Sequence, residues 1–172
     1  MSLQNKIDFA VVISVKNANP NGDPLNGNRP RIDYDGYGEI SDVCLKRKIR
    51  DRLLADGNSI FVQSDHNKID GMPSLRNRAL DEKVGLGPSA FNAKKTPPDK
   101  CAKLACAKWF DVRTFGQLFA FKGETKDGVS IPIRGPVTIQ SAFSVDTISV
   151  TSTQITKSVS GEGDGSKKSS DT

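Results

Sequence analysis

Residues 41–54 read Ser41-Asp-Val-Cys-Leu-Lys-Arg-Lys-Ile-Arg-Asp-Arg-Leu-Leu54 and form the most regular part of the sequence. Serine commonly caps the N-terminus of a helix. Apolar residues then recur every four positions, which places them on one helical face: Leu45, Ile49 and Leu53. Basic residues cover much of the remaining surface: Lys46, Arg47, Lys48, Arg50 and Arg52. The stretch therefore predicts an amphipathic helix with a strongly basic side.

Two contrasting segments precede this helix. From Ile7 to Val15 apolar residues occupy every second position, and part of the other face is also apolar, so we predict a central strand. Residues 17–40 are rich in Gly, Pro, Asn and Asp, which favours a long loop built from consecutive turns. Loops of this length inside a compact domain are often functional.

The sequence after the helix alternates between apolar and polar segments. Residues 59–63 predict a short strand, residues 100–121 a helix that breaks near Gly116, and residues 131–145 another strand region. The polar block 64–99 is interpreted as a surface insertion with one short helix over Arg76–Val84. Beyond about residue 150 the chain turns to Ser, Thr, Gly and Lys, a composition typical of flexible segments.

This order of elements is typical of an α+β fold of the RRM-like (ferredoxin-like) βαββαβ type. The last strand has no counterpart in the sequence, and apolar residues make up only 35% of the chain. We therefore expect a fold that is truncated at its C-terminus. The predicted division is a palm from 1–63 and 100–155, an insertion over 64–99, and a flexible loop from 156–172.

Length and composition narrow the class of protein. With 172 residues the chain is long enough for one domain, and its net charge of +5 suits a polyanionic partner. No apolar run approaches the roughly 20 residues of a membrane span, and the first residues do not resemble a signal peptide. Three cysteines without framework spacing favour a reducing cytoplasm.

Metal and cofactor sites are not predicted. The Asn17-x-Asn19-x-Asn21-Gly22 pattern resembles the start of a calcium loop, but Asn28 stands where a bidentate Glu is needed. The three cysteines and His66 show no zinc-knuckle spacing. A single histidine also disfavours histidine-based catalysis.

Two features favour contact with nucleic acid, although each has an ordinary explanation. Lys46 and Arg50 lie one helical turn apart and can neutralise successive phosphates, yet they also suit a solvated charged face. Residues 17–30 offer backbone N–H groups, asparagine amides and Arg29 to a phosphate backbone, but they also suit a set of tight turns.

Several motifs, in order along the chain, resemble the RAMP-superfamily backbone subunit of the type I-C CRISPR Cascade complex. They are Asn19-Pro-Asn-Gly-Asp-Pro24, Pro30-Arg-Ile-Asp33, Ser41-Asp-Val-Cys-Leu-Lys-Arg-Lys-Ile-Arg-Asp51, Phe110-Asp-Val-Arg-Thr-Phe-Gly116 and Arg134-Gly-Pro-Val-Thr-Ile-Gln-Ser-Ala-Phe-Ser144. The resemblance implies a modified RRM palm, a fingers-like insertion and a thumb that emerges after Ile155. It also implies a non-catalytic protein whose copies stack in a helical filament on the CRISPR guide RNA, beside other Cascade subunits, and present the spacer to target DNA in antiviral defence.

The resemblance also implies a set of RNA-binding residues. Those on the first helix and in the loop before it correspond to family positions that face RNA, and others follow from motif location alone. The predicted set is Asn19, Asn21, Arg29, Lys46, Arg47, Arg50, Arg113, Arg134 and Lys157, with Lys167 and Lys168 also at the base of the thumb. No cofactor, metal or membrane partner is implied.

Two alternatives remain open from the residues. One is a RAMP-type RNase that cuts target RNA with a loop aspartate, for which Asp33 is the candidate. The other is a general RRM-like RNA-binding protein. Its usual aromatic RNA-binding strand is missing, because the first predicted strand offers only Phe9.

Overall fold

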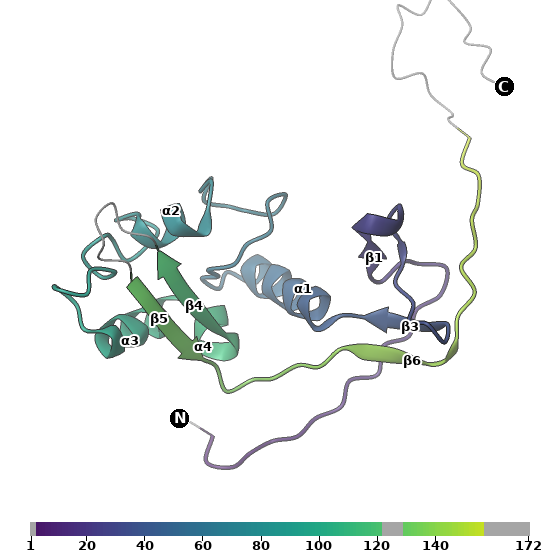
Figure 1. Ribbon diagram of the computed structural model, residues 1–172, viewed down its shortest axis with the longest axis horizontal. Helices are drawn as coiled ribbons and strands as arrows, with labels where there is room; N and C mark the ends of the chain where they lie inside the picture. The colour runs from purple at the N-terminus through teal and green to yellow at the C-terminus, as the bar shows by residue number, and fades with distance from the viewer. Residues whose placement is uncertain (1–2, 122–128, 157–172) are drawn as a thin grey trace, which may run out of the picture.

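The computed structural model describes residues 3–121 and 129–156, and in that part the chain has an α+β architecture (Figure 1). Figure 1 shows α2, α3, α4, β4 and β5 gathered at one end, β1, β3 and β6 at the other, and α1 between them. The elements in chain order are β1 (Gly22–Asp23), the 3-10 helix η1 (Pro24–Asn26), β2 (Arg29–Pro30), β3 (Tyr37–Ile40), α1 (Asp42–Ala55), α2 (Leu75–Leu80), α3 (Pro98–Lys108), α4 (Phe110–Phe115), β4 (Gly116–Phe121), β5 (Val129–Arg134) and β6 (Ala142–Thr147).

The described strands pair in three antiparallel two-stranded sheets, in place of the single RRM-like sheet that the sequence predicts. The sheets are β1–β2, β3–β6 and β4–β5. In β4–β5 the register runs from Gly116 opposite Arg134 to Phe121 opposite Val129. Gly116 has φ of 81°, and a Cβ there would lie 2.3 Å from the Ile133 carbonyl oxygen, so only glycine fits this turn from α4 into β4.

The helix predicted over residues 41–54 is confirmed as α1, but its predicted apolar stripe is not buried throughout, because Ile49 is exposed whereas Leu54 is buried. Ser41 is its N-cap, and the Ser41 hydroxyl accepts a hydrogen bond from the Cys44 backbone N–H at 3.3 Å. The helix ends at Ala55, with Asp56 as its C-cap, and Gly57 follows with φ of 84°. Figure 1 shows that α1 leads from β3 towards the end of the molecule that holds α3, α4, β4 and β5.

The hydrophobic core lies at the end of the molecule that holds α3, α4, β4 and β5. Phe61 is at its centre, with ring centroids 4.7 Å from Trp109 and 5.0 Å from Phe119. The Phe91 ring lies tilted against Phe119, with their centroids 5.2 Å apart. Small buried residues fill the remaining space, namely Ala79, Ala90, Cys101 and Ala105. An aromatic cluster of this kind buries much apolar surface with few side chains, which suits a chain with a low apolar content.

The polar block 64–99 contributes to this core. Ala79, Ala90 and Phe91 are buried in it. Arg78 is also buried, and its guanidinium donates to the Asp70 carboxylate at 2.8 Å and to the Phe61 carbonyl at 2.9 Å. The hydrogen bond from Arg78 holds the pKa of Asp70 below its usual value, against the opposing effect of burial. Some of the charged residues of this block are therefore internal, because Arg78 and Asp70 form a buried ion pair.

Three predicted elements differ from the structure. The predicted strand over Ile7–Val15 is extended but unpaired, and its alternating apolar side chains are exposed. Residues 59–63 form bends and coil, although Ile60 and Phe61 are buried. The helix predicted over Arg76–Val84 ends at Leu80. A strand requires a hydrogen-bonded neighbour, and no described segment pairs with Ile7–Val15.

The second half of the chain is more finely divided than the sequence suggests. The predicted helix and break over 100–121 become α3, α4 and β4, with the helices separated at Trp109. The predicted strand region over 131–145 becomes β5 and β6. None of the described helices is long and apolar enough to cross a membrane.

Candidate nucleic-acid interface

The basic side of α1 is the face that carries Lys46, Arg47 and Arg50, and two of these residues form ion pairs one turn along the helix. Lys46 Nζ lies 3.0 Å from an Asp42 carboxylate oxygen, and Arg47 Nη1 lies 3.8 Å from Asp51. The hydrogen bond from Lys46 lowers the pKa of Asp42, although partial burial opposes the shift. Partly exposed ion pairs of this kind add little stability. Exchanging such a pair for a phosphate contact would therefore cost little stability.

Arg50 lies in a different environment from Lys46, although the sequence gives both the same role. The Arg50 side chain is only 14% exposed, and its Nε lies 3.0 Å from the buried Asp111 carboxylate. Its guanidinium carbon lies 5.2 Å from the centroid of the Phe115 ring. Arg50 therefore joins α1 to α4, a role that its sequence position alone does not reveal.

The asparagine-rich loop, residues 17–30, is hydrogen-bonded to the start of α1. Asn21 Oδ1 accepts hydrogen bonds from both the backbone N–H and the hydroxyl of Ser41, each at 2.9 Å. Asn19 Nδ2 donates to the Asn28 carbonyl at 2.7 Å, which closes the turn that contains β1 and β2. The loop thus lies beside the first turn of the basic helix. Both asparagines therefore have structural contacts, although Asn19 is also exposed.

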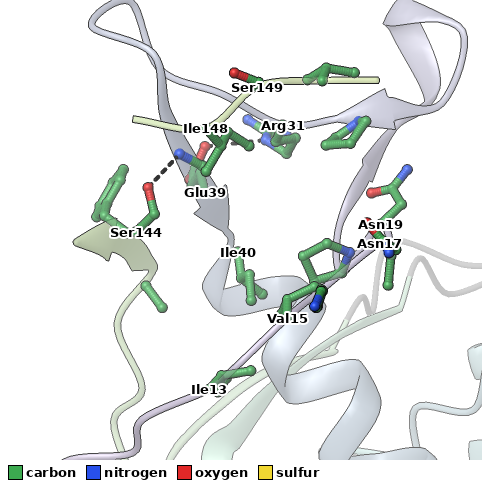
Figure 2. Close-up of a pocket in the computed structure, with 18 of the residues that line it drawn as sticks. Ile13, Val15, Asn17, Asn19, Arg31, Glu39, Ile40, Ser144, Ile148 and Ser149 are labelled. Atoms are coloured by element: carbon green, nitrogen blue, oxygen red, sulfur yellow. Dashed lines mark hydrogen bonds and ion pairs between the residues drawn. The ribbon is translucent and has the colours of Figure 1, made fainter. Parts of the chain in front are cut away.

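A groove of about 1200 Å³ opens beside this loop (Figure 2). It is lined by residues 11–13 and 15–20, by β3 and β6, and by residues 148–151. Figure 2 shows Ile13, Val15 and Ile40 along one side, and Arg31, Ile148 and Ser149 along the other. Arg31 Nε lies 3.2 Å from Glu39. The lining combines apolar side chains with asparagine amides, two basic side chains, Lys16 and Arg31, and the acidic Glu39. Amides and cations in a groove can contact a nucleic-acid backbone.

Comparison of the sequence with known proteins identifies the family of this chain. The family described as CRISPR-associated protein Cas7 matches residues 5–172. The chain belongs to the Cas7 family. A curated relative from Haloferax volcanii, named CRISPR-associated protein Cas7, is 35% identical over 128 residues, which is 74% of this chain and 36% of the relative. The chain therefore spans little more than a third of that relative's length.

The other predicted RNA-binding residues of this Cas7 chain do not form one patch. Arg29 is exposed in β2, within the asparagine-rich loop. Arg113 is exposed on α4, donates to the Cys106 carbonyl at 2.8 Å, and stacks on Phe110. Arg134 is exposed at the end of β5, and Figure 1 shows β5 and β1 on opposite sides of α1. Lys157, Lys167 and Lys168 lie outside the described residues.

Asp33, the candidate nuclease residue, closes a turn in this Cas7 chain. Its Oδ1 accepts hydrogen bonds from the backbone N–H groups of Asp35 and Tyr37, at 3.0 and 2.8 Å. Within residues 3–121 and 129–156, no group of three or more His, Cys, Asp or Glu side chains is placed to hold a metal ion. The arrangement around Asp33 is that of an Asx turn before β3.

Asp111 is the polar residue of this region that the sequence analysis missed. It is 1% exposed, and it accepts hydrogen bonds from the backbone N–H groups of Phe61 and Val62 at 2.7 and 3.0 Å, in addition to its contact with Arg50. The available signal was an acidic residue inside the apolar stretch Trp109-Phe-Asp-Val112. Charged residues are almost never fully buried unless they are paired.

Proposed function

We propose that this chain is part of a non-catalytic backbone subunit that binds CRISPR guide RNA, in a type I-C Cascade complex of the RAMP superfamily. Copies of the subunit assemble along the guide and present its spacer for pairing with target DNA. The palm is a modified RRM fold, completed by a fingers-like region and a thumb. Membership of the Cas7 family supports this proposal, and the sequence motifs support the type I-C assignment.

One observation carries the RNA-binding part of the proposal. The basic side of α1 begins where Asn21 fixes the asparagine-rich loop to Ser41, so cations, amides and the groove lie on neighbouring elements. Phosphate contacts from such groups position a nucleic acid without reading its sequence. Sequence reading then falls to base pairing by the guide, as in other RNA-guided systems.

The proposal predicts that Lys46→Gln weakens guide RNA binding. Each lost phosphate contact on a single strand reduces the slope of log K against log salt by about 0.7. The measurement is fluorescence anisotropy of the purified chain with a labelled CRISPR RNA across a salt series.

Arg52→Gln is the matched control for Lys46→Gln. Arg52 lies on the same helix and pairs with Asp56 at 3.1 Å, but it is six residues further along and therefore on another face. We expect Arg52→Gln to change the slope by much less. Equal slopes for both variants and the wild type would exclude the basic side of α1 as the RNA-binding surface.

The non-catalytic assignment has its own test. Both backbone hydrogen bonds to Asp33 Oδ1 support a structural role for this residue. We expect labelled target RNA to remain intact after incubation with the protein, guide RNA and Mg²⁺. Cleavage that disappears in Asp33→Asn would establish the RAMP-type RNase function instead.

A further inference from the structure

The buried carboxylate of Asp111 holds together three parts of the chain that are distant in sequence. Its two oxygens accept from Phe61 N–H at 2.7 Å, from Val62 N–H at 3.0 Å, and from Arg50 Nε at 3.0 Å. Asp111 belongs to α4, Arg50 to α1, and residues 61–62 to the segment that enters the core. One side chain therefore fixes α1 relative to the aromatic core.

Arg50 is held on two sides at this junction. Asp111 contacts the guanidinium at Nε, while the Phe115 ring lies 5.2 Å from the guanidinium carbon. Among the described residues, the two terminal nitrogens of Arg50 have no hydrogen-bond partner, so the ion pair orients the guanidinium without using all of its donors. Because Arg50 follows Lys46 by one turn, its anchoring also sets the rotation of the basic side of α1.

We propose that Asp111 is a positioning residue for RNA binding, acting through Arg50. An acidic side chain thus favours the binding of a polyanion, because it orients the helix that carries the cations. This inference rests on the proposed function, which makes the basic side of α1 the RNA-binding surface. It adds a residue that has no direct contact with RNA.

The sign of the effect distinguishes this role from ordinary electrostatics. Asp111→Asn removes one negative charge, and charge alone would strengthen the binding of RNA. The positioning role predicts the opposite: affinity for a labelled CRISPR RNA falls by about tenfold, the scale of a lost hydrogen bond to a charged group. Binding is measured well below the unfolding midpoint of each variant, so that loss of folded protein does not contribute.

Asp56→Asn is the control variant. Asp56 is an exposed carboxylate that follows α1 and pairs with Arg52, so its substitution removes the same charge without touching the core. We expect its affinity for RNA to equal or exceed that of the wild type. Affinity in Asp111→Asn that matches Asp56→Asn would overturn the inference.

Arg50→Lys tests the same role if Asp111→Asn does not fold. Lysine keeps the charge of α1 and leaves the two backbone hydrogen bonds of Asp111 in place, but it lacks the planar guanidinium that contacts both Asp111 and Phe115. We expect weaker RNA binding in spite of the unchanged charge, and wild-type affinity would overturn the inference. A wild-type chain that binds no guide RNA would instead contradict the proposed function.

Discussion

Asp70 and Asp111 both hold the backbone around Phe61, Asp111 directly and Asp70 through Arg78. Asp111 orders residues 61–62, and Asp70 holds the buried Arg78, which in turn donates to the Phe61 carbonyl. Every buried side-chain polar atom in the described residues has a hydrogen-bond partner. Breaking such a buried pair leaves a charge without compensation and is strongly destabilising.

Arg78→Met is therefore expected to lower the free energy of unfolding by about 3–5 kcal/mol at neutral pH. Urea unfolding followed by tryptophan fluorescence measures this change, because Trp109 lies in the same core. A loss below about 1 kcal/mol would show that the pair has no structural role.

The pair also sets a pH dependence. Arg78 lowers the pKa of Asp70 in the folded state. The stabilisation by the Asp70–Arg78 ion pair is therefore complete above the usual aspartate pKa near 3.9, and it is lost as pH falls through the lowered pKa of Asp70. In Asp70→Asn this contribution is missing at every pH. The stability difference between wild type and Asp70→Asn should therefore shrink below about pH 4.

At the scale of elements, local signals explain what the sequence predicts well. Helix α1 follows from Ser41 and from apolar residues at a spacing of four, and neither signal depends on distant parts of the chain. The stretch Ile7–Val15 has an equally regular pattern, but alternation shows only that a strand is possible. Pairing depends on a neighbouring strand, which the pattern of one segment cannot supply.

The exposed state of Ile7–Val15 gives a direct prediction. Val12 is 96% exposed, so Val12→Lys should change the free energy of unfolding by no more than about 0.5 kcal/mol. Ile131, which is buried against the aromatic cluster, is the comparison: Ile131→Ala should cost about 2–5 kcal/mol. A cost for Val12→Lys similar to that of Ile131→Ala would show that this segment is packed in solution.

At the scale of the whole molecule, the basic residues that give the net charge of +5 have different roles. Arg50 and Arg78 are internal ion-pair partners, whereas Lys46, Arg29 and Arg134 are partly or fully exposed. The sequence alone predicts the basic side of α1, whereas its hydrogen bonds to the preceding loop come from the structure. It does not distinguish an internal arginine from an external one, because that difference depends on Asp111 and Asp70, which lie 61 and 8 residues away.

The proposed function places the guide RNA on α1 and the asparagine-rich loop. Ultraviolet cross-linking of the chain to a CRISPR RNA, followed by mass spectrometry of the linked peptides, locates the contact surface without any substitution. We predict cross-links within residues 16–31 and 42–55, which border the groove and form the basic helix. Cross-links confined to α3 and residues 88–97, with none in those two segments, would contradict this RNA-binding surface.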